Sequence, residues 1–160
     1  MRYDKLIVAT DGSCLRNPGG ATGWAWVAED GRSCAGGAPK GTNQVGELYG
    51  VLTALRAFPV EDLTIQIDSE YAMNVATHWG ASWARRGWRT ASGDPVKNGP
   101  LVKLIVHLMR TRPAPVHFDK VPAHDRSGRW PLNDKADTLA KAAAKRADSL
   151  QATFFDLERT

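Results

Sequence analysis

The order of the predicted secondary-structure elements restricts the possible folds of this chain more than any other feature. Short apolar runs bounded by turn residues predict strands, and apolar residues that repeat every three to four positions predict helices. Three strands precede the first helix, after which helices and strands alternate. The predicted strands are 6–10, 23–28, 32–38, 63–67 and 116–121, and the predicted helices are 44–58, 71–77, 101–109 and 133–147. This order predicts an α/β fold with a five-stranded mixed sheet, an antiparallel meander plus parallel strands, covered by helices on both faces.

The length and composition bound the class of protein. The 160 residues suffice for one domain with its own core, and we assign residues 1–147 to this domain and 148–160 to a C-terminal tail. No apolar run approaches the roughly 20 residues of a membrane span, and residues 1–12 lack a secretory signal. Cys14 and Cys34 have no zinc-site spacing and are expected to be free thiols. We therefore expect a cytoplasmic protein without membrane contact.

Four acidic residues border the predicted core. Asp11 and Asp68 each follow an apolar strand, and Glu47 and Asp137 lie about 90° and about 100° from the apolar stripes of their helices on a helical wheel. Each acid alone also suits a turn, a helix cap or a first helical turn. Four carboxylates at one crevice repel one another unless a cation binds there. Oxygen ligands without Cys or His favour Mg²⁺ or Mn²⁺ over zinc.

A segment rich in tryptophan and arginine carries much of the positive charge. Residues 78–98 hold four basic residues and one acid, so they contribute +3 of the net charge of +4. Arginines that neutralise phosphates, beside flat rings that stack on sugars or bases, indicate a nucleic-acid-binding surface. The alternative is that the tryptophans belong to the core and the arginines form a solvated rim.

From Lys5 to Ala144 the chain resembles ribonuclease H of type 1, the bacterial-type ribonuclease HI family. Six blocks carry the resemblance, and together they are far more specific than any one of them. They are T-D-G-S-C-L-R-N-P-G-G at 10–20, T-N-Q with E-L at 42–48, D-S-E-Y at 68–71, R-R-G-W-R-T with P-V-K-N at 85–98, V-P-A-H at 121–124 and N-D-K-A-D at 133–137.

The resemblance implies a metal-dependent endonuclease that hydrolyses the RNA strand of RNA–DNA hybrids. It implies two Mg²⁺ ions, replaceable by Mn²⁺, bound by Asp11, Glu47, Asp68 and Asp137. The products would carry 3′-hydroxyl and 5′-phosphate ends, with little sequence preference, and the enzyme would act as a monomer. His124 would assist proton transfer or product departure.

The resemblance also implies a set of residues that contact the hybrid, several of them in a basic protrusion formed by residues 79–98. The minor groove would be contacted by Cys14, Asn17, Asn43 and Gln44, and a phosphate of the DNA strand would be bound by Lys40, Thr42 and Asn98. The DNA strand would be held by Trp79 and Trp83. Further aromatic surface and positive charge would come from Trp88, Arg85, Arg86 and Arg89.

Three departures from the family pattern concern particular positions. An insert at 125–130 separates His124 from Asp137 by thirteen positions, where the family usually has about ten. Gly46 and Gly50 form a small-residue strip on the first helix, which predicts close approach of another element. Ala91 replaces a hydroxyl residue that some relatives carry.

Two other functions fit parts of the sequence. A DNA-cutting nuclease of the same fold, such as a resolvase or a transposase-like enzyme, would share the clustered acids, but the Trp-Arg segment and the Asn43-Gln44 pair argue against it. A non-catalytic module that binds hybrids would not need all four carboxylates, and all four are present.

Overall fold

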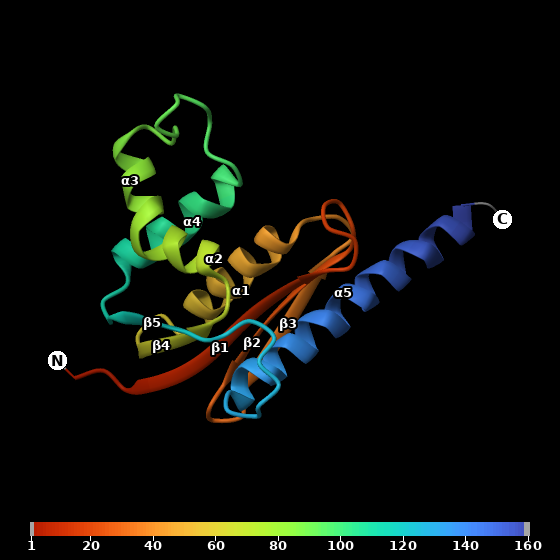
Figure 1. Cartoon of the computed structure of the whole chain (residues 1–160), viewed down its shortest axis with the longest axis horizontal. Coiled ribbons are helices and arrows are strands. Elements are labelled where there is room, and N and C mark those ends of the chain that lie inside the picture. Colours follow the sequence, from red (N-terminus) through yellow and green to blue (C-terminus); the bar gives the residue numbers. More distant parts are fainter. Residues whose placement is uncertain (1, 159–160) are drawn as a thin grey trace.

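The computed structural model describes residues 2–158, and the side-chain surroundings of residues 2–151. It contains a five-stranded sheet in the order β3-β2-β1-β4-β5 (Figure 1). β1 pairs antiparallel with β2 and β2 with β3, whereas β1 with β4 and β4 with β5 are parallel. The strands are β1 Lys5–Cys14, β2 Thr22–Ala28, β3 Ser33–Ala38, β4 Asp62–Ile67 and β5 Val116–Lys120. The predicted mixed sheet is confirmed.

Each predicted helix is present, but two are longer than their apolar patterns indicate. The helices are α1 Asn43–Ala57, α2 Glu70–Asn74, the π-helix η1 Val75–Trp79, α3 Gly80–Arg85, α4 Gly99–Thr111 and α5 Pro131–Glu158. The predicted helix 71–77 is the first part of a helical run that continues through η1 and α3. Among the described residues, no helix is long and apolar enough to cross a membrane.

The predicted end of the last helix at residue 147 is wrong. α5 continues to Glu158, because no glycine or proline interrupts the chain after Pro131. The predicted tail therefore begins as helix, and Figure 1 shows this part of α5 extending away from the sheet. The side chains of residues 152–160 lie outside the described residues.

The two faces of the sheet are covered by different kinds of side chain. On one face, α1 packs against β1 and β2, and α4 packs against α1; large aliphatic residues such as Leu48, Ile65 and Ile105 belong to one core. On the other face, α5 uses alanine: Ala136 packs with Ala9 and Val27 in a second, smaller core (Figure 1). Small side chains bring α5 close to β1 and β2, and this places Asp137 near the sheet.

Glycines allow α1 to approach β1 closely. A Cβ added at Gly12 would overlap the backbone of Gly46 and Glu47, and one added at Gly46 would lie 3.2 Å from Gly12 Cα. A Cβ at Gly50 would lie 3.1 Å from the Asp11 carbonyl oxygen. The predicted role of the Gly46 and Gly50 strip is confirmed, and this contact brings Glu47 beside Asp11.

β1 does not end before Asp11 as predicted. Its parallel ladder with β4 ends at Thr10 and Ile67, but its antiparallel ladder with β2 continues to Cys14. The strand continues because β2 still supplies a hydrogen-bonding partner after β4 has ended. Asp11 thus lies at the point where β1 loses one neighbour, directly beside the residue that follows β4.

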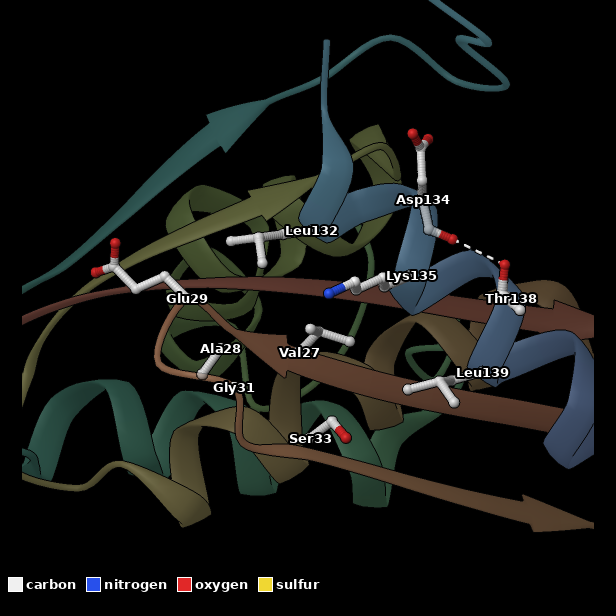
Figure 2. A pocket seen from close by; sticks show the side chains of 10 residues that line it. All are labelled: Val27, Ala28, Glu29, Gly31, Ser33, Leu132, Asp134, Lys135, Thr138 and Leu139. Atoms are coloured by element: carbon white, nitrogen blue, oxygen red, sulfur yellow. Dashed lines mark hydrogen bonds between the residues drawn. The ribbon is translucent and has the colours of Figure 1, made fainter. Parts of the chain in front are cut away.

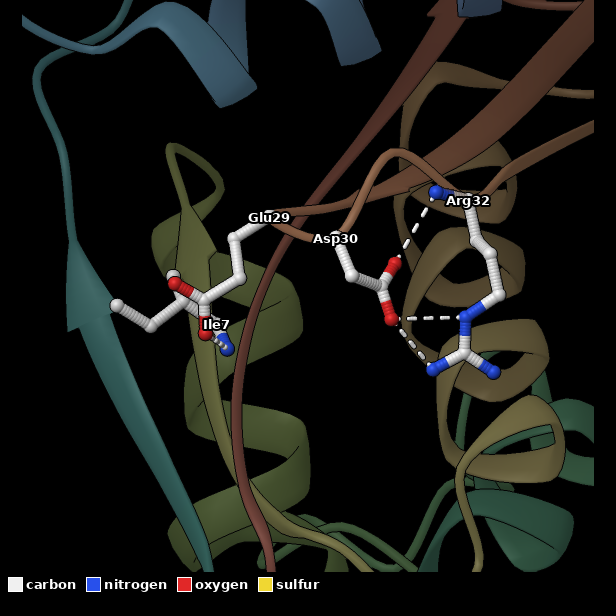
Figure 3. Close-up of polar contacts among 4 residues, drawn as sticks. All are labelled: Ile7, Glu29, Asp30 and Arg32. Carbon is white, nitrogen blue, oxygen red and sulfur yellow. Dashed lines mark hydrogen bonds and ion pairs between the residues drawn. The ribbon is translucent and has the colours of Figure 1, made fainter.

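Side-chain hydrogen bonds fix the turn between β2 and β3. The Glu29 carboxylate accepts a hydrogen bond of 2.9 Å from the Ile7 backbone N–H, and the Asp30 carboxylate accepts from Arg32 Nε at 2.9 Å (Figure 3). The Arg32 guanidinium lies over the Phe58 ring. These contacts stabilise one end of the meander.

A cavity of about 420 Å³ lies between this turn and the first turns of α5 (Figure 2). Its walls include Val27, Leu132 and Leu139, and the Lys135 side chain extends between Leu132 and Val27. None of the predicted site residues lines this cavity. Its size alone therefore does not mark it as the functional site.

Candidate active site

Three of the four predicted carboxylates meet in the structure. Asp11 comes from β1, Glu47 from α1 and Asp68 directly follows β4. One carboxylate oxygen of each lies within 4.8 Å of the others. The Asp11 residue is only 3% exposed, so the cluster is fixed at the floor of a site rather than at the solvated surface.

Local hydrogen bonds hold the elements that carry these acids. The Thr42 hydroxyl caps α1 by accepting from the Val45 N–H at 3.1 Å, and the Ser69 hydroxyl caps α2 by accepting from the Ala72 N–H at 3.1 Å. The first cap fixes the beginning of the helix that carries Glu47. The second fixes the turn immediately after Asp68.

Burial and mutual repulsion disfavour the charged forms of the three acids. Burial, together with the negative charge of Asp68, raises the pKa of Asp11 to about 8. Burial and the charges of Asp11 and Asp68 raise the pKa of Glu47 well above its usual range. Burial also raises the pKa of Asp68, while a hydrogen bond with Asp11 and the Lys120 charge lower it. A cation bound among them would reverse this cost.

The donor set fits a hard divalent cation. Glu47 Oε2 is buried without a hydrogen-bond partner, and so is the side-chain oxygen of the neighbouring Gln44. A buried carboxylate oxygen without a partner is costly unless a cation or a hydrogen-bond donor reaches it. The cluster offers carboxylate oxygen alone, which Mg²⁺ and Mn²⁺ prefer. The structure therefore supports a divalent metal site without identifying the metal.

Asp137 and His124 lie at the same cavity, outside the tight cluster. A cavity of about 320 Å³ is lined by the three clustered acids together with Asp137 and His124. Asp137 is near enough to Asp11 to raise the pKa of Asp11. Its carboxylate pairs with Lys141 Nζ at 2.9 Å. The catalytic roles of Asp137 and His124 remain predictions.

The residues predicted to read the minor groove form one connected edge beside this cavity. The Cys14 N–H donates to Asn43 Oδ1 at 3.0 Å, and the Asn43 N–H donates to Asn17 Oδ1 at 3.1 Å. The Cys14 thiol contacts the Gly41 carbonyl oxygen at 3.7 Å. These bonds tie the β1–β2 loop to the beginning of α1, where Gln44 also lines the cavity.

The residues predicted to bind a DNA-strand phosphate lie near the beginnings of two helices that pack together. Thr42 caps α1, and Asn98 precedes α4 in a left-handed conformation with φ of 57°. The Asn98 side chain donates to the Tyr71 hydroxyl at 3.2 Å. Lys40 is exposed on the segment between β3 and α1.

The basic protrusion combines exposed and half-buried rings. Trp79 is 42% exposed and lies 6.1 Å from Trp83 between ring centroids, which agrees with their predicted common face. Trp83 and Trp88 also pack against the main core, so the alternative that these tryptophans are core residues holds in part for both. The arginines of the protrusion are exposed, as predicted: Arg85, Arg86 and Arg89.

Three cations near the acids were not among the predicted site residues: Lys120, whose charge lowers the pKa of Asp68, Lys141 and Arg126. Lys141 pairs with Asp137 one helical turn away, and the i, i+4 spacing of an acid and a lysine was a usable signal for this pair. Arg126 lines a cavity together with Asp68 and Asp137. Its position depends on the course of the inserted loop, which has no periodic pattern.

Comparisons with known proteins agree with this geometry. A family model described as RNase H matches residues 3–145. Ribonuclease H of Tropheryma whipplei (strain Twist) is 41% identical over 146 residues, which cover 90% of this chain and 87% of that protein. Ribonuclease HI of Streptomyces coelicolor is 42% identical, over 88% of this chain and 62% of that protein.

A solved structure supports the fold. The crystal structure of LC9-RNase H1, described as a type 1 RNase H with the type 2 active-site motif, superposes with a TM-score of 0.78. It is 26% identical, and the match covers 92% of this chain and 75% of that one.

Proposed function

The chain belongs to the ribonuclease H family of metal-dependent endoribonucleases, which cleave the RNA strand of RNA–DNA hybrids, and we propose that this chain cuts by a two-metal-ion mechanism. The observation that carries this proposal is the convergence of the buried Asp11 with the half-buried Glu47 and Asp68. Three acids whose burial raises their pKa values are costly in a protein that does not bind a cation there.

Asp11, Glu47, Asp68 and Asp137 would hold the ions, with Asp137 exchanging its Lys141 partner for a metal. When bound, Mg²⁺ ions supply an activated water and stabilise the leaving 3′ oxygen during in-line displacement at phosphorus. The products then carry 3′-hydroxyl and 5′-phosphate ends. Asp11 and Glu47 contribute rigidity, because β1 and α1 fix both carboxylates before the substrate arrives.

His124 would act on the departing group. It is exposed on the loop between β5 and α5 and faces the same cavity as the acids. A histidine there can transfer a proton to the leaving 3′ oxygen or assist product departure.

The hybrid would lie across the protrusion and the groove-reading edge. Amides of Asn17, Asn43 and Gln44 would contact 2′-hydroxyls and base edges, which distinguishes RNA from DNA in the minor groove. Trp79 would pack against the DNA strand beside Trp83. Contacts of this kind give little sequence preference, because the base edges in a minor groove present nearly the same acceptors whatever the base pair.

We further propose that the enzyme is a cytoplasmic monomer that uses Mg²⁺, with Mn²⁺ as a substitute. Cys14 and Cys34 are free thiols in the structure, which agrees with a reducing compartment. Size-exclusion chromatography with light scattering tests the monomer directly, and a dimer mass would contradict it.

A gel assay with body-labelled substrates tests the function against its rivals. The enzyme is incubated with an RNA–DNA hybrid, single-stranded RNA and duplex DNA, each with Mg²⁺, Mn²⁺ or chelator. We expect cutting of the RNA in the hybrid only, and only with metal. Cutting of duplex DNA would favour a resolvase-like or transposase-like enzyme, and binding without cutting would favour a non-catalytic module.

A further inference from the structure

We propose that Arg126 binds a phosphate of the RNA strand next to the phosphate that is cut, in a cavity beside the carboxylate cluster. The inference rests on the proposed function, because it needs the hybrid as substrate. It gives a role to the inserted loop 125–130, which no part of the proposed mechanism uses.

The cavity directly adjoins the carboxylate cluster. It has a volume of about 300 Å³ and shares Asp68, His124 and Asp137 with the cavity that contains Asp11 and Glu47. A volume of this size accommodates a phosphate with bound water, since one water occupies about 30 Å³. Substrate bound at the metal site would therefore extend into it.

The two arginines of the loop, Arg126 and Arg129, have different surroundings. The Asp125 carboxylate accepts from the Ser127 N–H at 2.8 Å, and the Ser127 hydroxyl accepts from the Arg129 N–H at 3.2 Å. The Arg129 guanidinium lies over the Trp130 ring, 5.6 Å from its centroid. Arg126 lines the cavity instead, and within residues 2–151 no hydrogen bond or ion pair engages its side chain.

The charges around the cavity require a cation if a phosphate is to enter. Asp68, Asp125, Asp134 and Asp137 all line it, and they would repel a phosphodiester. Lys141 pairs with Asp137 in the structure and would be released when a metal takes that carboxylate, so Lys141 and Arg126 are the two cations that line this cavity. Arg126 is the cation of the loop that remains available, and its planar guanidinium suits bidentate binding of phosphate oxygens.

The geometry of a nucleic-acid strand identifies which phosphate this is. Phosphates follow one another along a strand, so when the scissile phosphate lies at the carboxylate cluster, its neighbour on the same strand is the phosphate nearest to the adjoining cavity. The other strand lies across the wide minor groove of the hybrid. The phosphate that meets Arg126 therefore belongs to the RNA strand.

Salt-dependent binding tests the charge contact. Hybrid binding is measured with Mg²⁺ in an Asp11→Asn background, so that the substrate stays intact, for Arg126→Ala, Arg126→Lys and the matched control Arg129→Ala. Arg126→Ala should weaken binding roughly tenfold at low salt and reduce the slope of log K against log salt by about 0.9, the value for one lost phosphate contact. Arg126→Lys should retain the slope, because the charge remains, and Arg129→Ala should match the parent.

A neutral phosphate analogue locates the contact. Methylphosphonate replaces, in turn, the phosphate on either side of the scissile one. Binding of each substituted hybrid is measured for the parent protein, Arg126→Ala and Arg129→Ala, and the losses of binding free energy are compared in a double-mutant cycle. At one of these positions the substitution should weaken binding by the parent protein but not by Arg126→Ala. An unchanged salt slope in Arg126→Ala, or additive effects at both positions, would overturn the proposal. Wild-type cutting of the same hybrid, run in parallel, separates this outcome from failure of the proposed function.

Discussion

At the scale of single residues, Asp11 has a direct consequence for the pH dependence of stability. Its pKa is raised from 3.8 to about 8 in the folded protein without metal, because burial and the Asp68 charge disfavour its ionised form. The folded state therefore holds a proton that the unfolded state releases between these two values. The stability that this proton contributes is complete below about pH 4 and is lost as the pH rises through about 8.

Asp11→Asn removes this pH-dependent loss. In chelator at pH 8 we expect the variant to melt at least about 3 °C above wild type. A change of one pKa unit corresponds to about 1.4 kcal/mol, and each kcal/mol shifts the melting temperature of a domain of this size by about 2–4 °C. Thermal melts at pH 5 and pH 8 check this. At pH 5 the gap should narrow, and Mg²⁺ at pH 8 should stabilise wild type more than the variant. A wild-type protein more stable than the variant at pH 8 in chelator would contradict the cause given for the raised pKa.

Arg112 shows how one side chain can hold two loops without any role at the site. Its guanidinium donates to the carbonyl oxygens of Phe58 at 2.6 Å and Glu61 at 3.1 Å, and to those of Ala114 at 2.8 Å and Pro115 at 2.9 Å. The segment after α1 and the segment before β5 are therefore joined through one cation.

Arg112→Ala should lower the free energy of unfolding by about 2–4 kcal/mol, because four carbonyl groups lose a charged donor. Arg112→Lys should recover only part of this loss, since an ammonium group lacks the planar fork. Chemical denaturation measures the effect, with the exposed Arg110→Ala as control. Equal stability of both alanine variants would show that the carbonyl groups find water at no cost.

At the scale of elements, the active site depends on how closely α1 lies on β1. Gly12 and Gly46 face each other at this contact, and no side chain fits between them. Gly12→Ala should destabilise the protein by about 1–3 kcal/mol through overpacking. It should also lower the cutting rate further than stability alone explains, because Glu47 moves away from Asp11. Gly99→Ala is the control, since an added Cβ there meets nothing within 4 Å.

The elements themselves were largely readable from the sequence, and the places where the prediction failed have physical reasons. Strand and helix periods located the five strands and the helices α1, α2, α4 and α5, but not α3, and the strand-end acids Asp11 and Asp68 marked the site. The length of β1 was not readable, because it depends on pairing with β2. The partial burial of Trp83 and Trp88 was only the alternative interpretation, because their neighbours in sequence are small or charged, whereas the core that they contact comes from distant parts of the chain.

At the scale of the whole molecule, the acids of the active site and the basic residues of the protrusion lie in different parts of the structure. The acids lie at the edge of the sheet, whereas the basic protrusion supplies +3 of the net +4. Replacing Arg85, Arg86 and Arg89 together with alanine should weaken hybrid binding by one to two orders of magnitude and reduce the salt slope by up to about 2.7. Thermal unfolding should be unchanged, because all three side chains are exposed.

The exposed pair Arg56→Ala and Arg110→Ala provides the control for this change of charge, since both residues lie outside the protrusion. If this pair reduced the salt slope by as much per removed charge as the three protrusion arginines do, binding would depend on net charge and not on the protrusion.

The central claim is that the buried carboxylate cluster cuts RNA in a hybrid through bound metal. Its most direct test is the single-turnover cutting rate of one RNA–DNA hybrid over a range of Mg²⁺ concentrations, for wild type, Asp11→Asn and the exposed control Asp119→Asn. We predict that Asp11→Asn folds and loses at least about three orders of magnitude in rate at every Mg²⁺ concentration, while Asp119→Asn cuts like wild type. Cutting by folded Asp11→Asn at a rate near that of wild type would contradict the account.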